Sequence, residues 1–160
     1  MQHAKHPAAG FTLIEILVVV IILGILAAIT FASFGTSLDE SRQKSFATNL
    51  RQFTEAAMIY HATTDTYPED SSSGELAEAL EPYIDKVAFE RPTPIGGVWD
   101  FEADDLGGWT AAVGVHFNGT GDTRDDAFML VLDDLLDDGD LSTGGFQKPE
   151  NDRYYAIISP

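Results

Sequence analysis

A single acidic residue, Glu15, lies inside a long apolar stretch, where its carboxylate could act only by pairing with another buried group. Between Leu13 and Ala32 no other side chain carries a charge. About 20 apolar residues, each rising ~1.5 Å along a helix, are enough to cross the ~30 Å hydrocarbon core of a bilayer. An unpaired carboxylate in hydrocarbon costs roughly 3 kcal/mol or more. We therefore expect Glu15 to have a functional partner of opposite charge.

A second group of oxygen-bearing side chains lies near the C-terminal end of the sequence. Asp138, Asp140 and Ser142 alternate with other residues in a glycine-rich segment, and such hard oxygen ligands suit calcium better than zinc. The segment lacks the sixth-position glycine and the closing glutamate of an EF-hand, so a solvated acidic turn is the commoner explanation. A looser acidic group, residues 100–105 with Asp122, is a second and weaker metal-binding hypothesis.

Catalysis has little support in the sequence. The chain has no cysteine, and neither His61 nor His116 belongs to a recognisable motif with a nucleophile. We therefore predict that the protein is not an enzyme. The net charge of −17 also argues against nucleic acid as a partner, because binding to phosphates needs clustered lysine and arginine.

A long helix must carry Glu15. The span is apolar all round, and residues 37–63 follow it without proline or glycine, with a helical apolar stripe at Phe46, Leu50, Phe53, Ala57 and Tyr60. Together they predict one helix of about 50 residues, whose second half packs against a core. Tyr67-Pro68 lies just beyond its end.

The remaining sequence predicts short elements around a sheet. Leu76, Leu80 and Tyr83 indicate a short helix that begins after capping serines at 71–73 and ends near Pro82. Strand patterns occupy residues 98–102, 109–117 and 154–158, with a helix at 125–138 between the last two strands. We expect an α+β fold in which the long helix packs on a small antiparallel sheet.

The N-terminal residues carry a resemblance to a known family. A short polar leader ending in Gly10, followed by Phe11-Thr12-Leu13-Ile14-Glu15 and an unbroken apolar helix, resembles the start of type IV prepilins and type II secretion pseudopilins. The resemblance implies that a prepilin peptidase cuts after Gly10 and methylates the new amine of Phe11. It also implies that Glu15 pairs with the Phe11 amine of a neighbouring subunit during filament assembly.

The resemblance also implies a domain plan, a location and partners. Residues 1–10 would be the leader, 11–35 the transmembrane and assembly half of the helix, and 36–160 a pilin-like head. The subunit would sit in a bacterial inner membrane with its leader cytoplasmic and its head outside, and then enter a filament of its own copies. Its other partners would be the assembly platform and minor pseudopilins. Major pseudopilins bind calcium in a C-terminal loop, which adds to the calcium hypothesis.

Three alternatives to a pseudopilin stay open. The first alternative is a type IV pilus subunit, which the N-terminal residues suit equally. The absence of cysteine and the Tyr-Pro pattern favour a type II secretion pseudopilin over it. The second alternative is an acidic domain anchored by an ordinary signal anchor, which binds cations or a basic partner. In the third, signal peptidase would cut near Thr30-Phe31-Ala32, but the apolar run is longer than a usual signal core.

Overall fold

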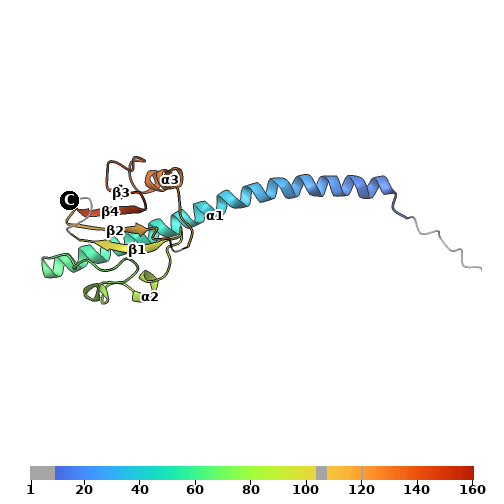
Figure 1. Ribbon diagram of the computed structural model, residues 1–160. Helices are drawn as coiled ribbons and strands as arrows, with labels where there is room; N and C mark the ends of the chain where they lie inside the picture. The colour runs from blue at the N-terminus through green and yellow to red at the C-terminus, as the bar shows by residue number, and fades with distance from the viewer. Residues whose placement is uncertain (1–9, 104–107, 120) are drawn as a thin grey trace, which may run out of the picture. The chain divides into compact units, whose positions relative to one another are not determined.

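The computed structural model describes residues 10–103, 108–119 and 121–160, so most of the predicted leader lies outside the described residues. The chain divides into two units, residues 1–39 and 40–160, and helix α1, Leu13–Thr64, contributes to both (Figure 1). Among the described residues one stretch, Leu13–Thr30, is long and apolar enough to cross a membrane, and none of it is buried. The single long helix predicted from the sequence is confirmed.

In the second unit, α1 packs through the predicted stripe. Phe46, Leu50, Phe53 and Ala57 are buried, and Tyr60 packs against the same core. The stripe is buried because these residues recur every three or four positions, which places them on one side of the helix. This side of α1 forms one side of the hydrophobic core.

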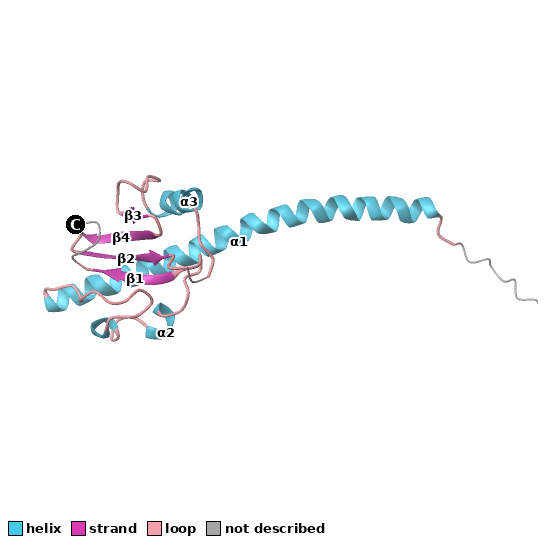
Figure 2. Cartoon of the chain, in the orientation of Figure 1, coloured by secondary structure: helices cyan, strands magenta, loops and turns pink. Residues whose placement is uncertain are grey.

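A sheet of four antiparallel strands packs against this side of α1 (Figure 2). The strands are β1 (Val98–Glu102), β2 (Ala111–His116), β3 (Phe146–Glu150) and β4 (Arg153–Ser159), in the spatial order β1-β2-β4-β3. Three of them agree with the predicted strands to within two residues at each end. The sheet places the C-terminal strand β4 between β2 and β3. The Arg153 side chain of β4 reaches across β2 to Asp100 of β1, at 3.6 Å.

Strand β3 was not predicted, because its sequence, Phe-Gln-Lys-Pro-Glu, has neither strong alternation nor β-branched residues. It is an edge strand, and sheets accept a proline such as Pro149 at edges and at irregular positions. Its pairing with β4 is irregular between Gln147 and Glu150. Tertiary pairing with β4 therefore imposes a strand that local propensity does not indicate.

Strand β1 is buried on both faces, whereas its alternating sequence predicted one buried face. Trp99 and Phe101 face the core, as expected. Asp100 and Glu102, on the opposite face, are also buried, at 1% and 6% exposure. The prediction of a solvent face was wrong because charged and polar side chains from β4 and from the segment after α1 cover it.

Helix α3, Asp126–Leu136, confirms the helix predicted at 125–138. Asp125 caps it by accepting a hydrogen bond from the Phe128 backbone N–H at 3.0 Å. Of its apolar side chains, Met129 and Leu132 are buried. Val131 and Leu135 are exposed, and Asp133 is fully buried beside Leu132.

The short helix predicted around Leu76 to Tyr83 is reduced to a single 3₁₀ turn, Glu78–Leu80. The serines do not cap it: the residue before the turn, Ala77, makes no side-chain capping bond. Glu81 still has helical backbone angles, but Pro82 supplies no backbone N–H to continue the hydrogen-bond pattern. A second short helix, α2 (Lys86–Phe89), was not predicted and is capped by Asp85.

Candidate functional site

The residues before α1 form a small hydrogen-bonded unit around Glu15. The Thr12 backbone N–H and the Thr12 hydroxyl both donate to the Glu15 carboxylate at 2.8 Å. In return, the Glu15 backbone N–H donates to the Thr12 hydroxyl at 3.3 Å. This reciprocal pattern is a capping box, in which the first and fourth residues satisfy each other's free groups at a helix start. The Glu15 carboxylate is thereby turned toward the N-terminal end of the helix.

The Thr-x-x-Glu spacing of a capping box is present in the sequence, which was interpreted only as predicting that Glu15 pairs with a neighbouring subunit. The two roles are compatible, because neutral donors from Thr12 satisfy the carboxylate's lone pairs without neutralising its charge. A cationic partner is still required if Glu15 is in hydrocarbon.

Gly10 and Phe11 are exposed and precede the helix. A Cβ added at Gly10 would meet no atom within 4 Å. The described part of the fold therefore gives no steric reason for a glycine at this position. A requirement for glycine would have to come from whatever recognises the Gly10–Phe11 bond.

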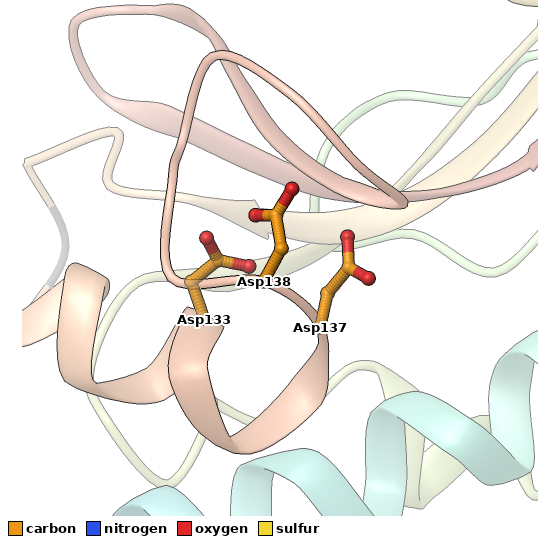
Figure 3. Close-up of side chains that lie close together, drawn as sticks. All are labelled: Asp133, Asp137 and Asp138. Carbon is orange, nitrogen blue, oxygen red and sulfur yellow. The ribbon is translucent and has the colours of Figure 1, made fainter.

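The loop after α3 brings three carboxylates together (Figure 3). One oxygen from each of Asp133, Asp137 and Asp138 lies within 4.8 Å of the others. Asp133 comes from the last full turn of α3, and Asp137 and Asp138 come from its C-terminal end. Sequence reasoning did not single out Asp133, because it lies within the helix and outside the loop pattern of Asp138, Asp140 and Ser142.

The other two residues of the calcium hypothesis pair with each other. Asp140 Oδ1 accepts hydrogen bonds from the Ser142 hydroxyl at 2.6 Å and from the Ser142 backbone N–H at 3.0 Å. Asp138 Oδ1 accepts from the Asp140 backbone N–H at 2.9 Å. Of the three predicted ligands, Asp138 alone belongs to the carboxylate cluster, and calcium binding stays a prediction.

Burial raises the pKa of Asp133 to about 6, and the charges of Asp138 and Asp137 add to the shift. The backbone N–H of Asp140 acts in the opposite direction and lowers the pKa of Asp133. The hydrogen bond of this N–H goes to Asp138. Each effect follows from electrostatics, because both low polarity and nearby negative charge disfavour the ionised form of an acid.

The weaker acidic group predicted from the sequence falls partly outside the described residues, which exclude Asp104 and Asp105. Asp100 is buried and accepts a hydrogen bond from the Tyr155 hydroxyl at 2.7 Å. Asp122 is exposed beside Arg124, at 3.8 Å. Both therefore have partners among side chains of this chain.

Comparisons with known proteins bear on the N-terminal segment and on the fold. Residues 5–31 match the model of the prokaryotic N-terminal methylation motif. The fold is similar to that of the major type IV pilin PilA1 from Clostridium difficile, with a TM-score of 0.54 and 16% sequence identity over 78% of this chain and 98% of that one. A search of curated protein sequences found no match.

The chain is type IV pilin-like in its fold and its N-terminal motif.

A membrane-anchored pilin fits the apolar segment of α1, and the methylation motif covers Gly10, Phe11 and Glu15. The expected architecture, a long helix followed by a small antiparallel sheet, is the pilin-like one. What the pilin-like fold does not explain is the polar network on the outer face of β1.

In that network, Ser73 lies beside His116. The Ser73 hydroxyl is 2.8 Å from His116 Nδ1 and donates to Asp100 Oδ2 at 2.9 Å. On the far side of the ring, His116 Nε2 is 3.4 Å from an Asp152 oxygen. Sequence reasoning found no nucleophile near His116, because the two residues are 43 positions apart.

This arrangement holds Ser73 rather than activating it. An ionised Asp100 carboxylate can only accept, so its bond uses the one proton of the Ser73 hydroxyl. In that arrangement the imidazole Nδ1 is the donor to the Ser73 oxygen. A general base would instead accept the serine proton. Tyr155 and Arg153 extend the network to Glu102, and together these bonds attach the segment after α1 to the sheet.

Proposed function

We propose that this protein is a filament subunit that polymerises through the apolar part of α1 after cleavage at the Gly10–Phe11 bond. The observation that carries the proposal is Glu15, a lone carboxylate at the start of a membrane-length apolar segment of α1, Leu13–Thr30, of which no residue is buried. A helix that is apolar all round needs lipid or other helices around it. In a filament, neighbouring copies of the same helix supply that environment.

Charge pairing gives the assembly its specificity. Prepilin peptidase would free and methylate the amine of Phe11, and Glu15 of one subunit would pair with that amine on the next. Removing one partner of a buried ion pair costs about 3–5 kcal/mol, because the other charge is left uncompensated. Axial displacement of one helix relative to its neighbour would break the pair, so the pairing also selects the register.

Within this class, we propose a type II secretion pseudopilus in the bacterial inner membrane, with the head outside and a cytoplasmic leader. The assembly platform and minor pseudopilins are the expected partners. The absence of cysteine and the Tyr67-Pro68 pattern support this choice. The alternative is a type IV pilus subunit, and the likeness to a major type IV pilin favours it to the same degree.

An enzymatic role has less support than a structural one. The pilin-like fold suits a structural subunit, and the Ser73 hydroxyl donates a hydrogen bond to Asp100. The acidic composition, with 26 acidic against 9 basic residues, disfavours nucleic acid as a partner. A membrane-anchored acidic domain that does not polymerise is the remaining alternative.

The first experiment is the intact mass and N-terminal sequence of the protein extracted from membranes of cells that contain a prepilin peptidase. We expect a chain that starts at methylated Phe11. A chain that keeps Met1, or one that starts near Ser33, would contradict the proposal and favour an anchored or a secreted domain.

A second measurement separates the two kinds of filament. Deletion in a host with a type II secretion system should stop protein export if the subunit belongs to a pseudopilus. Loss of long surface filaments with export intact would instead assign it to a type IV pilus.

A further inference from the structure

The outer side of α3 carries an apolar ridge that the described part of the chain leaves uncovered. Ala127, Val131 and Leu135 recur every four residues, so they form one row along the helix. Val131 is 59% exposed and Leu135 is 42% exposed, and Ala127 is exposed as well. The solvent side of a surface helix is normally polar, because removing apolar surface from water is favourable. The ridge is therefore a candidate contact surface.

The same unit of the chain also has an open apolar groove between α1 and the start of β3. The groove has a volume of about 320 Å³, and its apolar lining includes Leu50, Met58, Leu136 and Phe146. Val131 and Leu136 are five positions apart, which is about 140° around a helix, so the ridge and the groove lie on different sides of α3. One copy can therefore place its ridge in the groove of the next while its own groove stays free for a third, which is the head-to-tail contact of an open filament.

The charges beside the two surfaces favour a second copy as the occupant of the groove. Arg51 lines the groove, and Asp134 is exposed beside the ridge, three residues from Val131. Among the described residues, neither Arg51 nor Asp134 forms an ion pair with another side chain. Glu55 and Asp137 also line the groove, but the ridge offers them no cation. Arg51 is thus the counter-charge that the groove offers to the acidic residue beside the ridge.

The small size of the ridge also favours a second copy. Its three side chains offer far less than the ~800 Å² that each partner of a stable complex buries, so the ridge alone would not hold a free partner. A contact of this size acts between molecules that are already held together, because tethering raises their effective concentration. A copy held through the apolar part of α1 meets this condition.

We propose that α3 of one subunit packs into the groove between α1 and β3 of the next subunit, with Asp134 of the first paired to Arg51 of the second. Rows of side chains four residues apart pack into the grooves of a neighbouring helix in this way. The inference rests on the proposed filament and adds to it a specific contact between the heads.

Disulfide cross-linking tests the contact, because the chain has no cysteine of its own. Full-length Met58→Cys and Val131→Cys are produced in the same cells as separate subunits, and dimers are measured in membranes and sheared filaments. We expect dimers only when both variants are present, because the contact joins different surfaces of two copies. Val87→Cys is the matched control for Val131→Cys, since Val87 is 57% exposed, and it should give no dimers with Met58→Cys.

Charge reversal tests the ion pair. Arg51→Glu and Asp134→Arg should each lower the fraction of mature protein in sheared filaments by at least about fivefold. Both substitutions in one chain should restore it, because the pair is re-formed with its charges exchanged. The unfolding temperature in detergent should stay the same in all variants, which separates a lost contact from a lost fold.

Two outcomes would overturn this contact and leave the filament proposal intact. In the first, filaments form, but Met58→Cys with Val131→Cys gives no more dimers than the control pair, and charge reversal does not change incorporation. In the second, Val131→Cys alone gives dimers, which would indicate a symmetric contact between two α3 helices. A mature wild-type protein that enters no filament would instead contradict the proposed function, and this contact with it.

Discussion

The phenyl ring of Phe46 lies parallel to the indole of Trp99, with 4.7 Å between ring centroids and 12° between ring planes. Phe53, two turns further along α1, meets the same indole edge-on at 4.9 Å. One tryptophan of β1 is thus held by two aromatic residues of the helix stripe. Such pairs stabilise by about 0.5–1.5 kcal/mol beyond the area they bury.

We expect Phe46→Ala to destabilise the protein by about 3–5 kcal/mol, because it removes a fully buried ring and leaves a cavity against Trp99. Urea unfolding in detergent, followed by tryptophan fluorescence, measures this. Ile59→Ala is the control, since Ile59 is on the same helix but 53% exposed, and it should change the unfolding free energy by about 0.5 kcal/mol or less. Equal losses in the two variants would contradict the packing described here.

A bulky residue at Gly10 should block processing without disturbing the fold. A side chain at this position meets no atom within 4 Å, so Gly10→Val should leave the far-UV circular dichroism and the unfolding midpoint unchanged. The uncleaved precursor should accumulate and remain absent from filaments, as seen by immunoblotting of whole cells and sheared filaments. Filaments built from uncleaved Gly10→Val would refute the assigned cleavage site.

Glu15→Val should allow membrane insertion and cleavage but lower filament incorporation by at least about tenfold, because the Phe11 amine of the neighbour loses its counter-charge. The fraction of mature protein in sheared filaments measures incorporation. Glu55→Val, at an exposed position of the same helix, is the matched control and should assemble. Normal assembly of Glu15→Val would rule out the pairing mechanism.

Asp126 should make the head less stable in acid. Hydrogen bonds from Lys148 and from the Tyr154 hydroxyl, both at 2.6 Å, lower the pKa of Asp126 from its usual 3.8. The folded state therefore favours the ionised form, so the stabilisation is present above about pH 4 and is lost as the pH falls through the lowered pKa.

In Asp126→Asn this part of the pH dependence should disappear. The measurement is the unfolding free energy at neutral pH and below about pH 3, with Asp134→Asn as the charge control. We expect wild type and Asp134→Asn to lose more stability on acidification than Asp126→Asn. The effect should be small, because Asp126 is more than half exposed, at 57%. Equal losses in all three proteins would contradict it.

The sequence by itself determined the features that depend on local order. The apolar run around Glu15, the stripe from Phe46 to Tyr60 and the strand at residues 98–102 each show their periodicity within a few turns or residues, so the long helix and three strands could be predicted. The Gly10–Phe11 junction was equally visible, because recognition of an exposed segment depends on consecutive residues.

Only the tertiary structure decided which polar residues became buried neighbours. Ser73 meets His116, and Asp133 loses water beside Asp137 and Asp138. Strand β3 likewise forms because β4 lies next to it, against a weak local preference. Burial and pairing depend on what the rest of the chain places nearby, and the energetic cost of an unpartnered carboxylate arises only once the fold has removed its water.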